Sequence, residues 1–320
     1  MARSSSQLTG GEGLPGGPIA RAGERLGERG ALALFLVPAL AVIAVAQFYP
    51  LVESIIITTH DWTLARSPVM GRFVGLDNYA RALTDPQFVG STGFTLLLAV
   101  GSTVISLAFG LGLALLTVGE GFHFRLSRTL LMLPMVIAPV AVGTMWRMIL
   151  AARVGPLNQA LAGIGIDGPN WLGDPNWAAA SVIIVDAWQW TPFVTIVMAA
   201  ALASLPADVL RAAEVDGAGR WTIFRRIVFP MILPVFLLVA MFRAIDALMT
   251  LDIIFTTTGG GPGFATQTLS FWIYQQGLRY FNISYAAAAS WILLAGCLVV
   301  AAGFLVWRSR ISGWQRERGA

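Results

Sequence analysis

The chain has 320 residues, of which 56% are hydrophobic and only 12% are charged, and its formal net charge is +4. Its mean hydropathy of +0.72 is too high for a soluble globular domain. The composition therefore excludes a soluble protein and predicts one bundle of membrane-spanning helices of about 20 residues each.

Several chemistries are excluded by residues that the chain lacks or holds only once. All basic residues are arginines, and the absence of lysine excludes both a P-loop and Schiff-base catalysis. The single cysteine, Cys297, cannot form an intrachain disulfide. The two histidines, His60 and His123, lie far apart and lack metal-ligand spacing, so no metal site is predicted.

The chain begins with a polar leader and a first apolar run. Residues 1–30 are rich in Gly, Ser, Pro and charge, which predicts a disordered leader. The run that follows contains AVA before Gln47, which resembles a signal-peptidase site, but the run continues beyond this residue. This continuation favours an uncleaved first span.

Five further apolar runs follow, each near the length that a bilayer requires. They cover residues 91–118, 129–150, 177–203, 231–255 and 285–307. We therefore predict an all-α membrane protein with six transmembrane helices within residues 31–307, followed by a tail of residues 308–320 on the same side as the leader. Pro134 and Pro139 in the third run are expected to kink a helix within ordinary bundle packing.

The orientation of this bundle is predicted from the arginines in its short connecting segments. Arginines gather in the leader, in the loop after the second run, in the segment before the fifth run and in the tail. Because cytoplasmic loops carry an excess of Arg and Lys, these four segments and both termini are predicted to be cytoplasmic.

The segment of residues 204–230, which we call the elbow, separates the fourth run from the fifth. Pro206 and Asp208 favour the start of a short helix, Gly217 and Gly219 are expected to break it, and Gly217 is a candidate for a left-handed turn position. A second short helix is predicted to follow, with Pro230 ending it at the membrane surface. From physical chemistry alone, such a segment lies on lipid headgroups or inserts into a groove of a partner protein.

The elbow resembles the EAA loop of binding-protein-dependent ABC importer permeases. Ala212, Ala213, Gly217, Ile227 and Pro230 occupy places of the family pattern, and DGA at 216–218 resembles the form of the carbohydrate branch. Arg211 stands where the family usually has glutamate. The residues that the resemblance marks as an ATPase-coupling loop are Arg211, Ala212, Ala213, Glu214, Asp216, Gly217, Ala218, Trp221, Phe224, Ile227 and Pro230.

Two further stretches resemble the same branch, namely FVGLDNYARALTDPQF and the TGGGPG-containing segment before the last run. The resemblance implies a type I ABC importer permease fold in a bacterial or archaeal cytoplasmic membrane, in the class of maltose, multiple-sugar and glycerol-phosphate permeases. It implies four kinds of partner: a second, non-identical permease, two copies of a cytoplasmic ATPase, an extracytoplasmic substrate-binding protein and membrane lipid. Neither a nucleic-acid partner nor a catalytic role is expected, and ATP and Mg²⁺ are expected on the ATPase.

Polar residues inside the runs are candidates for a translocation path, because ionisable groups in a membrane are costly unless they pair or face a cavity. In the fifth run Arg243, Asp246 and Thr250 have helical spacing, and in the fourth run a carboxylate precedes two tryptophans. The candidates are Asp186, Trp188, Trp190, Arg243, Asp246, Thr250 and Asp252. They either bind a polyhydroxylated solute or, in the structural alternative, form an Arg243–Asp246 pair that locks the bundle. In the alternative, alanine at Asp246 alone lowers protein yield more than replacement of both residues.

Two other classes of membrane protein remain as alternatives. An ion-coupled secondary transporter also has six or more spans and buried charges, but it needs a coupling-ion site and often has repeated halves. A membrane enzyme needs a converging catalytic constellation, and the sequence indicates none. In a secondary transporter the charged elbow would also have no purpose.

Overall fold

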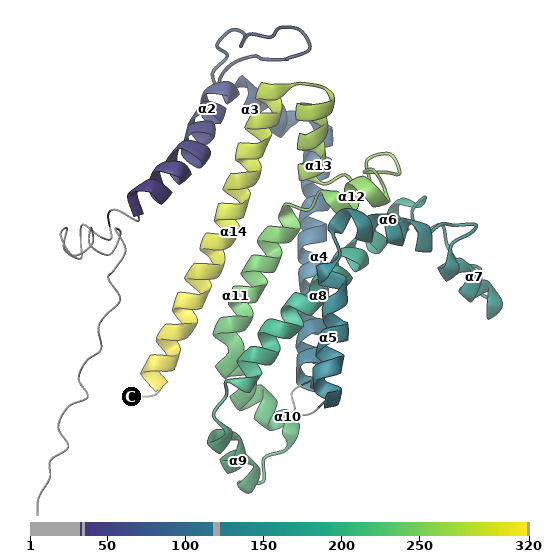
Figure 1. Cartoon of the computed structure of the whole chain (residues 1–320), viewed down its shortest axis with the longest axis vertical. Coiled ribbons are helices and arrows are strands. Elements are labelled where there is room, and N and C mark those ends of the chain that lie inside the picture. The colour runs from purple at the N-terminus through teal and green to yellow at the C-terminus, as the bar shows by residue number, and fades with distance from the viewer. Residues whose placement is uncertain (1–32, 34–35, 118–121, 319–320) are drawn as a thin grey trace, which may run out of the picture. The chain divides into compact units, whose positions relative to one another are not determined.

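The computed structural model describes residues 33, 36–117 and 122–318, with side chains described up to residue 117 and from 129 to 308. The predicted leader, residues 1–30, lies outside this part of the chain. The chain divides into two units after Ile56, and each is described by itself. The described residues are helical or irregular, apart from an isolated β-bridge between His60 and Phe73 (Figure 1).

The predicted first span is a helix, Leu36–Thr58, which is long and apolar enough to cross a membrane. It contains a π-helical turn, Ala44–Phe48, followed directly by α2, Tyr49–Thr58. The apolar run therefore continues as a helix beyond Gln47, as the sequence predicted.

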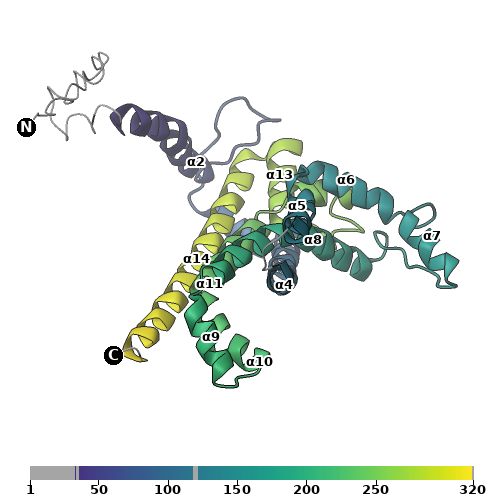
Figure 2. The same cartoon turned by 60° about the horizontal axis from the view of Figure 1, so that its bottom comes forward.

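The second unit consists of twelve further α-helices in the described residues. Their bounds are α3 Asp77–Thr84, α4 Pro86–Thr117, α5 Phe122–Val136, α6 Pro139–Ile149, α7 Pro156–Gly163, α8 Pro175–Ala203, α9 Ala207–Val215, α10 Arg220–Ile223, α11 Phe229–Leu248, α12 Asp252–Thr257, α13 Leu269–Tyr274 and α14 Ile283–Arg318. Figures 1 and 2 both place α9 and α10 at the opposite end from α13, and we call these the elbow end and the loop end. The predicted tail continues α14 as helix to Arg318.

The third apolar run is not one straight span. Thr129–Val136 and Pro139–Ile149 form two helices bent by 98° at the break between them. Ala138 has an extended ψ of 137°, as expected of a residue before proline, and Pro139 has no N–H to continue the helix. The part of the chain that the structure describes thus has five helices able to span a membrane, or six if the bent pair counts as one.

The fifth span differs from the prediction at both ends. Its helix is continuous over Arg220–Leu248 and includes a π-helical turn, Phe224–Val228, so Pro230 does not end it. In this turn the Phe229 N–H bonds to the Phe224 carbonyl, and such irregular turns let a helix continue where a proline cannot donate. The helix ends at Leu248, and Asp252 begins the separate helix α12.

The two longest described interior helices begin in the same way. Asp85 and Asp174 each precede a proline at the first helical position, and each carboxylate accepts a hydrogen bond from a free N–H of the first turn, at 2.8 Å from Gln87 N and 2.9 Å from Asn176 N. This side-chain cap satisfies groups that a helix start leaves unpaired. Both caps fix the loop-end boundaries of α4 and α8.

Close packing of α4 on α8 forms the centre of the second unit. A Cβ at Gly110 would lie 2.5 Å from Val194 Cβ, so only glycine permits this approach. Small residues are expected at such contacts, because lipid provides no hydrophobic drive between helices. Helix α11 packs against both, and α14 packs against α11.

Candidate functional site

The elbow forms a compact turn between α8 and α11. Helix α8 ends at Ala203, Pro206 directly precedes α9, and α9 ends at Val215. Gly217 has φ +75°, which confirms the predicted left-handed position, while Gly219 has φ −66° and precedes α10. The elbow therefore folds as one short helix, α9, followed by a glycine turn. The predicted second short helix is wrong, because α10 is the first turn of the continuous helix Arg220–Leu248.

One side of the elbow is packed against the membrane-spanning helices. Ala213, Ile223 and Val228 are buried in an apolar cluster that also contains residues of α4, α8 and α11. Ala218, Phe224, Ile227 and Pro230 are half-buried. This packing attaches the elbow firmly to both helices that enter it.

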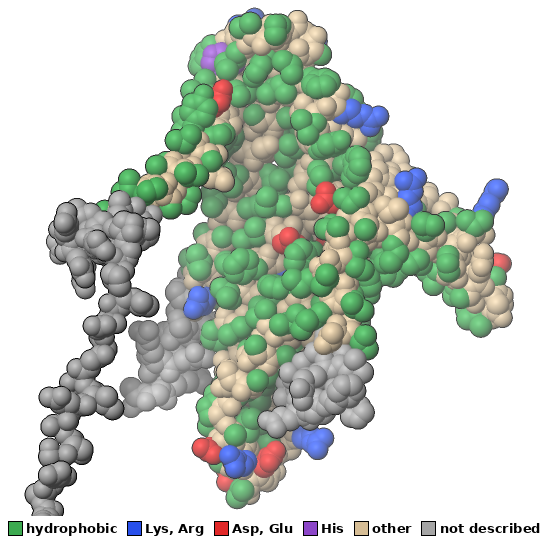
Figure 3. Space-filling view, in the orientation of Figure 1, with side chains coloured by type: hydrophobic (Ala, Val, Ile, Leu, Met, Phe, Trp, Pro, Cys, Tyr) green, Lys and Arg blue, Asp and Glu red, His purple; other side chains and the backbone are tan. Residues whose placement is uncertain are grey.

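The other side of the elbow is exposed. The exposed members of the predicted coupling set are Arg211, Ala212, Glu214, Asp216, Gly217 and Trp221. The Trp221 ring is 70% exposed and stacks on Phe224 with centroids 5.6 Å apart. Arg211 pairs with Asp208 at 3.2 Å on the surface, and Figure 3 shows acidic and basic side chains gathered at this end. The elbow thus presents a mixed charged and aromatic surface.

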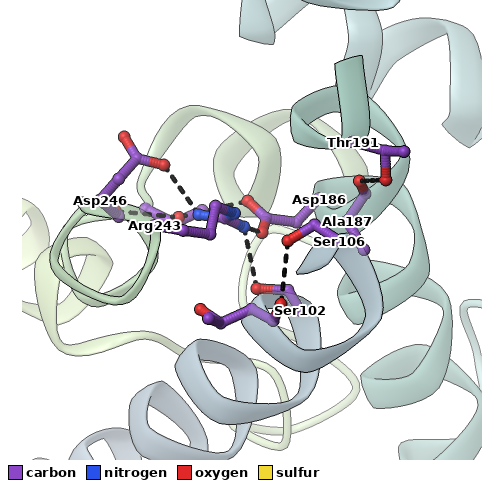
Figure 4. Close-up of polar contacts among 9 residues, drawn as sticks. Ser102, Ser106, Asp186, Ala187, Thr191, Arg243 and Asp246 are labelled. Atoms are coloured by element: carbon purple, nitrogen blue, oxygen red, sulfur yellow. Dashed lines mark hydrogen bonds and ion pairs between the residues drawn. The ribbon is translucent and has the colours of Figure 1, made fainter. Parts of the chain in front are cut away.

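A polar cluster lies inside the bundle, where α4, α8 and α11 meet (Figure 4). Arg243 of α11 forms ion pairs with Asp186 of α8 and with Asp246 of its own helix, the second at 2.8 Å between Nη1 and Oδ2. Its Nη2 also donates to Ser102 Oγ of α4 at 2.9 Å. A single guanidinium therefore joins all three helices.

The two carboxylates of this cluster have different environments. The Asp186 side chain is 1% exposed, whereas that of Asp246 is 41% exposed. The buried Arg243–Asp186 pair crosses between helices, and the sequence spacing did not reveal it. The predicted Arg243–Asp246 pair is confirmed as a contact, but it is the more exposed half of a larger cluster.

A cavity of about 230 Å³ opens beside the cluster. Helices α8, α11 and α12 contribute to its wall, together with the first residue of α6 and the connection after α11. Its lining residues are Pro139, Asp186, Gln189, Trp190, Asp246, Met249, Thr250, Leu251, Asp252 and Ile253. Complete ligand pockets usually have about 300–1,000 Å³, so this chain forms a small polar recess.

The structure brings together most of the predicted path residues, but not Trp188. Asp186, Trp190, Asp246, Thr250 and Asp252 line the cavity, whereas Arg243 is not a lining residue but is paired with Asp186 and Asp246. Thr250 lies beyond the end of α11, so the predicted shared helical face is wrong at this residue. The chain nevertheless returns its hydroxyl to within 3.4 Å of Asp186 Oδ1.

Trp188 lies on another face of α8. Its ring packs edge-on against Trp146, with centroids 5.4 Å apart, and it lines a separate apolar pocket. Successive residues of a helix are rotated by about 100° around its axis. Trp188 follows Asp186 by two positions, so the two side chains lie about 200° apart, on nearly opposite faces of α8.

Ser102 and Gln189 belong to the site but were not predicted. Gln189 follows Asp186 by three residues, a spacing that places both on one face of α8 and that the sequence reading overlooked. Ser102 gave no signal, since serines are common at helix contacts in membranes. Only the packing of α4 against α8 and α11 brings it to Arg243.

These features define a helical membrane protein with a protruding elbow and an ionised cluster in its interior. Residues 106–312 match the family described as binding-protein-dependent transport system inner membrane component. The chain belongs to this family. It is therefore a multi-pass membrane protein and an ABC transporter permease.

Curated relatives support this assignment along almost the whole chain. The chain is 36% identical over 295 residues to a probable ABC transporter permease protein, y4oQ, of Sinorhizobium fredii, covering 92% of this chain and 95% of the relative. It is 32% identical over 271 residues to the trehalose/maltose transport system permease protein MalF of Thermococcus litoralis, covering 83% and 89%.

A solved structure supports the fold. The chain matches a subunit in the crystal structure of a bacterial alginate ABC transporter in complex with alginate pentasaccharide-bound periplasmic protein, with a TM-score of 0.78. The two are 23% identical, and the match covers 91% of this chain and 98% of that chain. The predicted type I importer permease fold is confirmed.

Proposed function

We propose that the chain is the membrane-spanning subunit of an ATP-driven importer that moves a carbohydrate-like solute into the cytoplasm. The solute class is a sugar, an oligosaccharide, a polyol or a glycerol phosphate. The observation that carries the proposal is the elbow, whose outer side is exposed and which joins two of the three helices of the polar cluster, α8 and α11. The family membership and the trehalose/maltose relative support it.

The elbow is the proposed docking element for a cytoplasmic ATPase. Its outer surface offers Arg211, Glu214 and Asp216 beside the exposed Trp221 ring, a combination suited to insertion of a short helix into a groove. The chain has no lysine and so no P-loop of its own. In the proposal ATP and Mg²⁺ are bound by two copies of the ATPase, and this subunit is not catalytic.

The same two helices lead from the elbow to the cavity. Asp186 precedes Ala203 by 17 positions on α8, which corresponds to roughly 26 Å along the helix axis. Arg243 lies on the helix that begins inside the elbow at Arg220 and runs to Leu248, and it is paired with Asp186. Movement of the docked elbow therefore acts on α8 and α11 together and changes the walls of the recess between them.

A second, non-identical permease is proposed to complete the path, since the recess of this chain is small and leaves room for an opposite wall. A substrate-binding protein is proposed to deliver the solute at the loop end. The arginine distribution supports cytoplasmic termini in a bacterial or archaeal cytoplasmic membrane.

The test is purification of the tagged chain, expressed from its own operon, followed by reconstitution. We expect a P-loop ATPase and a second six-span permease to copurify, and solute uptake to require ATP. Recovery of the chain alone, with uptake that follows a proton or sodium gradient without ATP, would overturn the proposal and favour the ion-coupled secondary transporter.

A further inference from the structure

The charge of the cavity walls has one sign. Asp186, Asp246 and Asp252 line the cavity, and none of its lining residues is basic. Arg243 is not a lining residue but forms ion pairs with Asp186 and Asp246, so the three aspartates and Arg243 together have a formal charge of −2. Asp252 is exposed and forms no ion pair within the described residues.

A second observation indicates that the cavity receives a ligand. Gln189 lines the cavity and is only 3% exposed, yet its Oε1 has no hydrogen-bond partner among the described residues. Its Nε2 donates to the Ile137 carbonyl at 3.2 Å, which fixes the orientation of the amide, because the reverse orientation would place two oxygens together. A buried acceptor without a donor is costly, so an N–H or O–H group that reaches Gln189 Oε1 would be stabilised there.

Two further polar side chains of the walls offer acceptors of hydrogen bonds, while the Trp190 indole N–H is a donor. The Asp246 carboxylate is partly exposed, and the Thr250 hydroxyl already donates towards Asp186 and so presents its lone pairs. Trp190 adds an aromatic ring that lies beside the Arg243 guanidinium at 5.6 Å. Aromatic faces attract cations and also pack on the apolar faces of sugar rings.

We infer that the cavity accepts donor-rich solutes that are neutral or positively charged and disfavours anionic ones, with Gln189 Oε1 accepting a hydrogen bond from the solute. Hydroxyl and ammonium groups match the acceptors of its walls, whereas a phosphate or carboxylate would meet three carboxylates balanced by a single arginine. This inference rests on the proposed function and narrows it, because it removes glycerol phosphates and acidic sugars from the solute class.

Charged thiol reagents measure the sign of the cavity without knowledge of the solute. In the assembled transporter without its binding protein, Cys297→Ala removes the native cysteine and Thr250→Cys places a thiol in the wall. The thiol is modified either by the cationic reagent trimethylammonioethyl methanethiosulfonate or by the anionic reagent sulfonatoethyl methanethiosulfonate. The rate of the first reaction divided by that of the second is the cation-to-anion ratio, which rises where the surroundings are negative. Phe264→Cys, at an exposed residue of the loop end with no charged sequence neighbour, corrects for the intrinsic reactivity of the reagents.

The cation-to-anion ratio of modification rates is expected to be about tenfold higher at Thr250→Cys than at Phe264→Cys, since charged clefts concentrate ions of opposite sign. In a background with Asp246→Asn and Asp252→Asn the ratio is expected to fall towards the control. Met249→Cys is a second reporter in the same wall. A ratio at or below the control, or no modification at either reporter, would overturn the inference.

Three hexose derivatives of similar size then test solute charge directly. Glucosamine and glucose at equal concentration are expected to slow modification of Thr250→Cys, and glucuronate is not. Gln189→Leu, which removes the free acceptor, is expected to weaken protection by both sugars while the reagent ratio stays unchanged. Equal protection by glucuronate, or full protection in the Gln189 variant, contradicts the inference. Neither the modification rates nor the protection by sugars requires ATP-driven transport. A protein that shows both but has no ATP-dependent uptake would therefore contradict the proposed function and not the charge preference of the cavity.

Discussion

The elbow and the polar cluster lie along the same pair of helices, α8 and α11, and differ in how they are built. The elbow is continuous in sequence, and its outer residues are exposed. The cluster combines residues from α4, α8 and α11 that are up to 144 positions apart, from Ser102 to Asp246, and its central guanidinium is fully buried. The first is a surface for a partner, while the second holds the bundle together and also faces a cavity.

This difference separates two effects of mutation. Changes in the cluster should alter the free energy of unfolding of the permease, because buried charges lose their partners. Changes on the outer side of the elbow should leave the permease folded and alter its assembly with the ATPase. The predictions below run from the largest expected change in permease stability to the smallest.

Asp186→Ala is expected to have the largest effect. It leaves the buried Arg243 with Ser102 and the half-exposed Asp246, and removal of one partner of a buried pair costs about 3–5 kcal/mol. Asp246→Ala should cost less, since Arg243 keeps Asp186. Thermal unfolding of the purified permease measures both, and an equal loss in the two variants would mean that the interhelical pair is not the stronger one.

Double replacements identify the true partner of Arg243. The sequence alone suggested that changing Arg243 and Asp246 together relieves the loss, but the structure reverses this expectation because Asp186 would then be stranded. Asp186→Leu with Arg243→Met should recover most of the stability, since apolar residues of similar size often replace a buried pair without loss. Recovery by the Arg243 and Asp246 pair instead would contradict the geometry.

The packing of α4 on α8 gives the next largest effect. Gly110→Ala places a methyl group 2.5 Å from Val194 Cβ, and overpacking of this kind costs about 1–3 kcal/mol. Gly112→Ala, two positions away with open space around it, is the matched control and should be neutral or slightly stabilising. Equal melting temperatures of the two variants would show that the helices are not in close contact at Gly110.

Most of the fold was predictable because a membrane span has a strong compositional signal. The first, second, fourth and sixth runs became helices close to their predicted positions. The fifth run was displaced because a π-helical turn carries the helix past Pro230, and the third was broken at Pro139. The bend at Pro139 agrees with the expected kink, whereas the continuation past Pro230 was not predicted, because the effect of a proline on a helix depends on whether neighbouring backbone groups can adjust.

The candidate site was predictable only in part. A local motif identifies the elbow, since the short helix α9, the glycine turn and the first turn of the fifth span lie in one segment. The Arg243–Asp246 pair follows from helical spacing, whereas the Arg243–Asp186 pair depends on the contact of two helices and has no local signal. Gln189 shares a face with Asp186, and its spacing alone could have indicated it.

Gly217→Val tests the elbow through its backbone. A β-branched residue at φ +75° costs about 1–2 kcal/mol locally, and Gly219→Val at φ −66° is the matched control, since neither site has an atom within 4 Å of a new Cβ. Membrane insertion should be normal in both variants, while ATP-dependent uptake and copurification of the ATPase should fall only in the Gly217→Val variant. Normal uptake in that variant would count against a coupling role for the glycine turn.

Trp221→Ala is expected to have the smallest effect on the permease itself. The ring is 70% exposed, so the free energy of unfolding should change by less than about 0.5 kcal/mol. If the ring fills a groove of the ATPase, its loss should weaken assembly by about 2 kcal/mol, or roughly thirtyfold, whereas Trp221→Phe should retain most of the affinity. Titration of the ATPase against the permease in nanodiscs measures this. Unchanged affinity in the alanine variant, together with weaker binding of an elbow peptide to liposomes, would assign the ring to the membrane surface instead.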